Sequence, residues 1–201
     1  SESDDSEVDQ TSAASRSMTL VDGMAFNMED YVQQTVQKYV DCAGSAPLKK
    51  VPTPFVAEGS LNPSDDEVVG ELQNSACGVI MKSLWVARLA RPDVFKPIND
   101  LSSKVSKWTK NCDKQLHRLI CYLHSTPGYR LTGYVNDPPH KLKLKLYVDA
   151  DFAGDREDAK STSGGFLVLS GPQTQFPLGW VAKKQTSVSR STTEAEVVSL
   201  A

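Results

Sequence analysis

The spacing of apolar residues changes near Tyr129, and this change limits the possible folds more than any other feature of the sequence. Over residues 116–123 the apolar side chains recur at helical spacing, which is typical of a helix that packs one face on a core. Over residues 142–146 leucines alternate with lysines, which is typical of a half-buried strand. The sequence therefore predicts a helical part followed by a part built on a sheet.

The same spacing rules predict the order of the elements. Helices are expected over residues 28–44, 64–90, 95–108 and 116–123, with a proline-rich connector over 45–63 and a break at Thr126-Pro127-Gly128. Strands are expected over residues 142–149, 166–169 and 178–184, and a last helix begins near Glu194. We expect an α/β chain, α+β overall: a disordered acidic lead-in over 1–25, a helical segment over 26–128, and a unit of three antiparallel strands and a helix over 129–201.

Charge is distributed unevenly along the chain. Residues 1–70 carry 13 acidic and 4 basic side chains, whereas residues 71–201 carry 12 acidic and 18 basic ones. Over residues 82–130 there are ten Lys or Arg against three Asp. The net charge of −3 therefore hides a basic region that suits a polyanionic partner, although a solvated helical face has the same composition.

Several classes of protein and site are disfavoured. No apolar run approaches the roughly 20 residues that cross a bilayer, and the first residues lack a secretory pattern. We expect an intracellular chain, cytoplasmic or nuclear, with no membrane partner and with reduced thiols. Cys112, His117, Cys121 and His124 are spaced either as a zinc site or as a helix flank beside a core stripe, and only three of the four share a helical face.

Two acidic pairs could carry chemistry. Asp149 and Asp151 are two residues apart at a strand end, so their carboxylates leave the strand on the same face, where a hard cation such as Mg²⁺ finds oxygen ligands. A strand that ends in polar residues before a turn has the same pattern. Glu194 and Glu196 begin the last helix, where acidic residues also favour the helix dipole.

The order in which several short motifs follow one another is more specific to a protein family than any single motif. After Asp149-Ala150-Asp151 come Ser161-Thr162-Ser163-Gly164, then Trp180-Val181-Ala182-Lys183-Lys184-Gln185, then Ser191-Thr192-Thr193-Glu194-Ala195-Glu196. This order closely resembles the ribonuclease H region of copia-type retrotransposon Pol polyproteins. Upstream, the segments 84–93 and 122–126 resemble stretches of the reverse transcriptase thumb and connection in the same family.

The resemblance implies roles for individual residues. Asp149 and Glu196 match the family's first two catalytic, metal-binding carboxylates, and Asp151 is an adjacent candidate ligand of a two-Mg²⁺ site. Lys183 and Lys184 match a basic segment near the nucleic-acid backbone, and the basic helices add the candidate contacts Arg88, Lys107, Lys110 and Arg118. The implied partners are an RNA–DNA hybrid and the rest of the Pol polyprotein.

Departures from the family pattern set the expected activity. The sequence contains neither the paired aspartates of the polymerase palm nor the two later carboxylates of ribonuclease H. We therefore expect a Pol fragment that does not cleave a hybrid by itself. The alternatives are a non-catalytic remnant that binds nucleic acid through basic helices 82–130, and a decayed reading frame without function.

Overall fold

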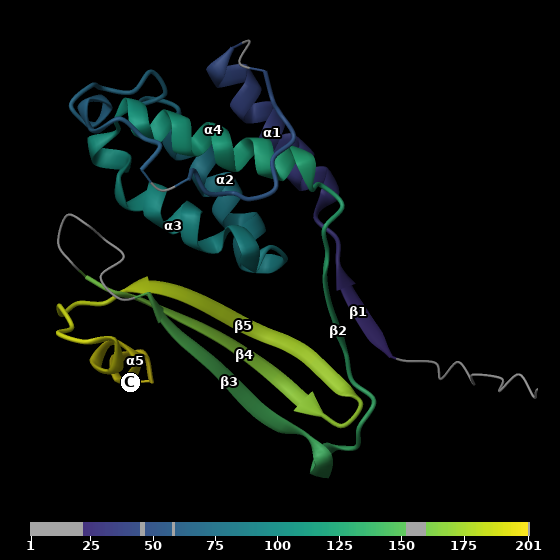
Figure 1. Ribbon diagram of the computed structural model, residues 1–201. Coiled ribbons are helices and arrows are strands. Elements are labelled where there is room, and N and C mark those ends of the chain that lie inside the picture. The colour runs from purple at the N-terminus through teal and green to yellow at the C-terminus, as the bar shows by residue number, and fades with distance from the viewer. Residues whose placement is uncertain (1–21, 45–46, 58, 152–159, 201) are drawn as a thin grey trace, which may run out of the picture.

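The computed structural model describes residues 22–44, 47–57, 59–151 and 160–200. Their elements form three layers: a helical bundle, an antiparallel sheet below it, and one helix against the other face of the sheet (Figure 1). The bundle consists of α1 (Glu29–Ala43), α2 (Ala76–Leu89), α3 (Phe95–Ser103) and α4 (Lys110–Ser125), and the helix on the other face is α5 (Thr192–Leu200). The expected α+β architecture is confirmed.

None of the described helices is both long enough and apolar enough to cross a membrane.

The sheet has five strands in the described part of the chain. They are β1 (Gly23–Phe26), β2 (Leu131–Tyr134), β3 (Lys143–Asp151), β4 (Thr162–Gly171) and β5 (Thr174–Lys184), in the antiparallel order β1-β2-β5-β4-β3. The predicted meander is β3–β4–β5, and the predicted helix after it is α5.

Strands β1 and β2 were not predicted. They pair with each other from Gly23↔Tyr134 to Phe26↔Leu131, and β2 joins the meander at Tyr134↔Gln175. Strand β1 begins inside the range 1–25 that was expected to be a disordered lead-in; residues 1–21 lie outside the described residues. The turn expected after the polar strand end at Asp151 also lies outside them.

The hydrophobic core lies in the helical bundle. Its fully buried side chains come from all four helices and include Val32, Ile80, Ile98, Leu116, Leu119 and Leu123. Each such side chain stabilises the fold by about 1.5–3 kcal/mol relative to an exposed one. On the strands, by contrast, the buried apolar side chains of the described residues are Val168 and Pro177. The sheet therefore depends on its contacts with the helices.

The second helix is shorter than predicted. It begins at Ala76, whereas residues 64–75 form a short 3-10 helix (Pro63–Asp66) followed by turns. The carboxylate of Asp113 in α4 accepts hydrogen bonds from the backbone N–H groups of Glu71 (2.6 Å) and Leu72 (3.2 Å). These long-range bonds satisfy backbone groups that a continuous helix would have paired locally, which explains the error. The third helix likewise ends early, at Ser103, before a 3-10 turn over Val105–Lys107.

Two side-chain hydrogen bonds attach the sheet to the bundle. Trp180 of β5 donates through Nε1 to the carbonyl of Ala87 in α2 at 2.9 Å. Asn99 of α3 donates through Nδ2 to the carbonyl of Ala182 in β5 at 2.8 Å. These bonds tie α2 and α3 to β5 beside the cleft described below.

Candidate nucleic-acid interface

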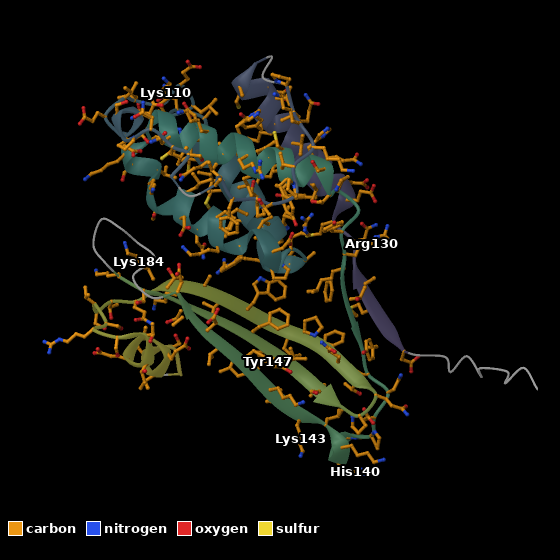
Figure 2. The ribbon with its side chains drawn as sticks, viewed as in Figure 1. Lys110, Arg130, His140, Lys143, Tyr147 and Lys184 are labelled. Carbon is orange, nitrogen blue, oxygen red and sulfur yellow. The ribbon has the colours of Figure 1, made fainter. Side chains whose placement is uncertain are left out.

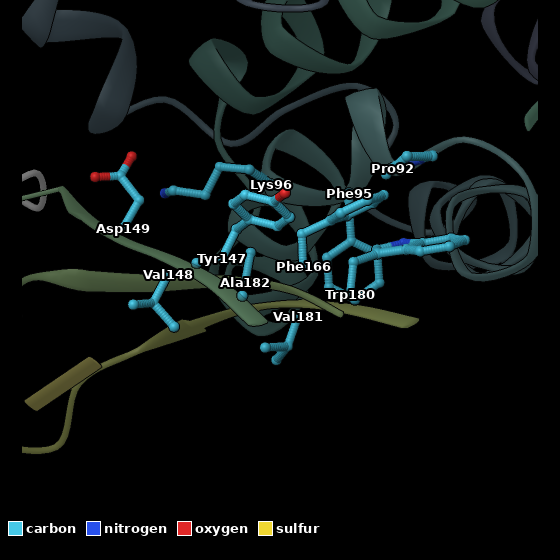
Figure 3. Close-up of a pocket in the computed structure, with 12 residues that line it drawn as sticks. Pro92, Phe95, Lys96, Tyr147, Val148, Asp149, Phe166, Trp180, Val181 and Ala182 are labelled. Atoms are coloured by element: carbon cyan, nitrogen blue, oxygen red, sulfur yellow. The ribbon is translucent and has the colours of Figure 1, made fainter. Parts of the chain in front are cut away.

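Asp149 and Asp151 lie at the end of the edge strand β3. Both are exposed and belong to one regular strand, so their side chains leave on the same face, as expected. Figure 3 shows Asp149 and Tyr147 pointing to the α3 side of the sheet and Val148 pointing to the other side. The Asp149 carboxylate accepts a hydrogen bond from the backbone N–H of Ala150 at 2.9 Å.

Glu196 belongs to the layer on the opposite side of the sheet. Helix α5 packs against β3, and the Ser199 hydroxyl donates to the backbone carbonyl of Asp149 (3.3 Å) and lies 3.1 Å from the hydroxyl of Ser163. Ser163 is the cross-strand neighbour of Ala150, which lies on the face away from the Asp149 carboxylate. The structure therefore does not bring Glu196 and the Asp149 carboxylate together.

Glu194 caps the N-terminus of α5. Its carboxylate accepts from the backbone N–H of Arg190 at 2.7 Å, and its own N–H donates to the Ser191 hydroxyl at 3.1 Å. The arrangement is similar to a capping box, except that the carboxylate accepts from the residue before the N-cap Ser191. The acidic residue is thus explained by helix initiation.

The described carboxylates do not fit a two-magnesium centre. Among residues 22–44, 47–57, 59–151 and 160–200, no group of three or more His, Cys, Asp or Glu could hold a metal ion. Asp149 faces the bundle, and Asp151, two residues on in the same strand, shares its face, whereas Glu196 belongs to α5 in the layer beyond the sheet. The metal-binding roles of these three residues stay predictions.

The zinc alternative is not supported by the described part of the chain either. Cys112 is buried in the core, and Cys121 is buried beside His117, with 3.4 Å between Sγ and Nε2.

The Tyr39 hydroxyl shares a 2.9 Å hydrogen bond with Nδ1 of His117. Burial, with smaller effects of Cys121 and Asp113, raises the pKa of Tyr39 to about 12. Burial, together with Lys49, lowers the pKa of His117.

Lys183 and Lys184 lie at the end of β5, close to α5, and Figure 2 shows Lys184 there. In the sheet register, Lys184 pairs with Thr162, which pairs with Asp151, and Lys183 pairs with Ser163. Both lysines are exposed, and both line an open cleft of about 350 Å³ between β5 and α5. The sheet thus brings the predicted backbone-contacting lysines to the same corner as the acidic end of β3.

Gln185, the residue after this lysine pair, was not predicted as important. It is 5% exposed, and its amide donates to the Ser163 hydroxyl (3.0 Å) and to the carbonyl of Ala195 in α5 (2.9 Å). Its carbonyl oxygen accepts from Ser189 at 3.1 Å. Gln185 therefore fastens α5 to the sheet, and the only sequence signal was its place in the Lys183-Lys184-Gln185 motif.

The four predicted contacts on the helical segment differ in their surroundings. Arg88 and Lys107 are exposed. Lys110 pairs with Asp65 at 3.1 Å, and the guanidinium of Arg118 donates to the carbonyl (2.8 Å) and hydroxyl (3.0 Å) of Thr53. Arg118 therefore holds the proline-rich connector on α4. Arg88 and Lys107 remain the more accessible candidates for phosphate contact.

The two upstream motif segments meet in one buried network. Arg91 is 2% exposed, and its guanidinium donates to the carboxylate of Asp93 (2.8 and 2.9 Å) and to the carbonyl and hydroxyl of Thr126 (2.8 Å each). The Tyr122 hydroxyl donates to the same carboxylate at 2.9 Å. Burial and this carboxylate raise the pKa of Tyr122. The motif residues of 84–93 and 122–126 thus lock α2, α3 and α4 together.

An open cleft of about 300 Å³ separates the start of α3 from the sheet. Figure 3 shows the rings of Phe95, Tyr147, Phe166 and Trp180 around it, with Lys96 extending over Tyr147 toward Asp149. Lys96 also pairs with Asp100 on its own helix at 2.6 Å. No local sequence pattern indicates this cleft, because its rings come from three strands and a helix.

Comparison with known proteins identifies several relatives. The retrovirus-related Pol polyprotein from transposon RE1 of Arabidopsis thaliana is 38% identical over 122 residues, which cover 61% of this chain and 8% of that protein. The corresponding polyprotein from transposon TNT 1-94 of Nicotiana tabacum is 28% identical over 177 residues, 86% of this chain and 12% of that protein. The chain belongs to the Pol polyproteins of copia-type retrotransposons.

This Pol chain spans a small part of the polyproteins that it matches. A further relative, the secreted RxLR effector protein 161 of Plasmopara viticola, is 36% identical over 126 residues, 63% of this chain and 82% of that protein. No family model and no solved structure matches the chain.

Proposed function

We propose that this Pol chain contains reverse transcriptase thumb and connection helices (residues 26–128) followed by the opening of a ribonuclease H-like domain (residues 129–201). It binds an RNA–DNA hybrid through the phosphate backbone and, as a separate polypeptide, does not cleave it. The order of the motifs and the family membership support the division.

The observation that carries this proposal is the register of the meander. Asp151, Thr162 and Lys184 are neighbours across three strands, so the acidic end of β3 and the basic end of β5 form one corner of the sheet. Lysines that neutralise phosphates supply sequence-independent affinity for nucleic acid. Carboxylates beside them place oxygen ligands within reach of the same backbone.

The positions of the carboxylates support the proposed lack of cleavage. Two-metal hydrolysis of a phosphodiester needs several ligands that converge on both metal ions. In the described residues Asp149 faces α3 and Asp151 shares its strand face, whereas α5 with its Glu196 lies in the layer on the opposite side. If Mg²⁺ is bound in a complete domain, it supplies Lewis-acid activation of water; the described residues supply two oxygen ligands on one face.

Binding and cleavage are tested together with residues 1–201 and an end-labelled RNA in a hybrid with DNA. We expect affinity that falls as salt rises, with a slope of about −0.9 for each phosphate contact, and intact RNA after incubation with Mg²⁺. The double variant Lys183→Ala/Lys184→Ala should reduce the salt slope by about one for each lysine that contacts a phosphate. Lys38→Ala, an exposed lysine on α1, is the matched control and should leave the slope unchanged.

Either half of the proposal can fail separately. An affinity that does not change between low and moderate salt contradicts backbone binding. Metal-dependent cleavage that is lost in Asp149→Asn contradicts the proposed lack of activity. That result would instead indicate a nuclease site at the end of β3.

A further inference from the structure

Three aromatic rings form a row across the meander. Tyr147 of β3 pairs with Phe166 of β4, and Phe166 pairs with Trp180 of β5, so the three side chains share the face that points to α3. The rings of Phe166 and Trp180 are stacked, with centroids 6.1 Å apart and planes inclined by 21°. The hydrogen bond from Trp180 to Ala87 fixes the inner end of this aromatic row.

The outer end of the aromatic row is open. Tyr147 lies on the edge strand and is 58% exposed, whereas Phe166 and Trp180 are partly covered. Pro92 and Phe95 line the opposite wall of the cleft, whose volume of about 300 Å³ is at the lower end of the range for small-ligand sites. A flat, apolar slot of this size with an exposed ring at its mouth suits one planar aromatic group.

Positive charge follows β3 away from Tyr147. Lys145 and Lys143 alternate with leucines on the same strand, so their side chains leave on the same face as Tyr147, at intervals of about 6.8 Å. Both are exposed, and neither has an ion-pair partner within the described ranges. Lys96 of α3 extends past the ring toward Asp149 and pairs with Asp100 on its own helix. An aromatic ring that leads into a basic track is the combination that binds single-stranded nucleic acid.

We propose that the cleft between α3 and the sheet binds one unpaired base of a single-stranded nucleic acid, stacked on Tyr147, with Lys145 and Lys143 beside the adjoining phosphates. A base inside a duplex has both faces covered by its neighbours, so it cannot enter the cleft. The inference rests on the proposed binding of nucleic acid and goes beyond it by naming an unpaired base as the ligand of a separate site.

Fluorescence anisotropy with a labelled single-stranded DNA of about 12 nucleotides, within the range of known single-strand site sizes, tests the proposal. Tyr147→Ala should weaken binding roughly 5- to 150-fold, which corresponds to the 1–3 kcal/mol measured for a stacked base. Tyr147→Phe keeps the ring and should bind within about twofold of the parent, since stacking needs only the ring. Tyr134→Ala removes an exposed tyrosine from β2, and it should bind as the parent does.

A second ligand separates this inference from the proposed function. An RNA–DNA hybrid of the same length should bind Tyr147→Ala as tightly as the parent chain, because hybrid binding uses backbone contacts. If the single strand binds the parent chain and Tyr147→Ala equally, while the hybrid still binds with a salt-dependent affinity, the proposed stacking site is refuted and the proposed function stands. If the single strand binds neither protein, the stacking site is also wrong. If Tyr147→Phe loses as much affinity as Tyr147→Ala, the hydroxyl and not the ring makes the contact, and stacking is refuted.

Discussion

Replacing Arg91 by methionine tests whether the family motifs have a structural role. The guanidinium bridges Asp93 in the turn before α3 and Thr126 after α4, and it lies between the rings of Tyr122 and Tyr129, with its Cζ 5.5 and 5.2 Å from their centroids. Methionine retains much of the buried side-chain volume but none of the five N–H donors. The change therefore removes the bridge and keeps most of the packing.

The expected loss can be worked out from the partners that remain. Breaking a buried ion pair costs about 3–5 kcal/mol, because a charge is left without a partner. Here Asp93 is 35% exposed and keeps the Tyr122 hydroxyl, so water recovers part of that cost. The buried carbonyl of Thr126 is left without its donor, at about 1–3 kcal/mol. We expect the free energy of unfolding to fall by about 2–4 kcal/mol, equivalent to a Tm lower by roughly 5–15 °C.

Urea unfolding followed by far-UV circular dichroism and tryptophan fluorescence measures this loss. Arg88→Ala is the matched control, since Arg88 is an exposed cation one turn earlier in the sequence and should change stability by less than about 0.5 kcal/mol. A double-mutant cycle of Arg91→Met with Tyr122→Phe should show coupling, because both residues bind the carboxylate of Asp93. An Arg91→Met chain as stable as the Arg88→Ala chain would refute the reasoning.

Two further changes test the helical bundle. Burial lowers the pKa of His117 from 6.5, so below that pH the unfolded chain binds a proton that the native chain excludes, and unfolding free energy is lost as pH falls. Denaturant titrations at several pH values should show a smaller loss of unfolding free energy on acidification in His117→Gln than in the parent chain. An equal dependence on pH in the two chains would contradict this. Gly70→Ala should cost about 1–3 kcal/mol in thermal unfolding, because its Cβ would come within 2.6 Å of the Thr109 carbonyl. Gly179→Ala meets no neighbour within 4 Å, and an equal loss there would exclude a steric cause.

The sequence determined the elements whose side-chain spacing is regular. Helices α1 and α4 followed from local apolar periods, because each buries one face and the period reports which residues share it. Strand β3 followed from alternation, and β4 and β5 from short apolar runs between turns. The expectation that β3 is half-buried was wrong, because Leu144 and Leu146 are 67% and 58% exposed. The common face of Asp149 and Asp151 followed from the two-residue period of a strand. The order of short motifs also led to the Pol family, which the relatives confirm.

Only the tertiary structure decided features that depend on distant residues. Strands β1 and β2 are too short to give a period, and they exist because their backbones pair with each other, more than 100 residues apart. The start of α2 moved to Ala76 because Asp113, more than 40 residues later, binds the backbone of Glu71 and Leu72.

The candidate site shows the same division. The sequence identified Asp149, Glu196 and the lysine pair but contained no information on which face of the sheet α5 covers. In the structure, hydrogen bonds from Gln185 and Ser199 hold α5 on the side opposite the Asp149 carboxylate. The aromatic row likewise exists only after the register aligns Tyr147, Phe166 and Trp180. Local spacing sets which side chains share a face, whereas long-range backbone pairing sets what that face meets, and no local pattern encodes it.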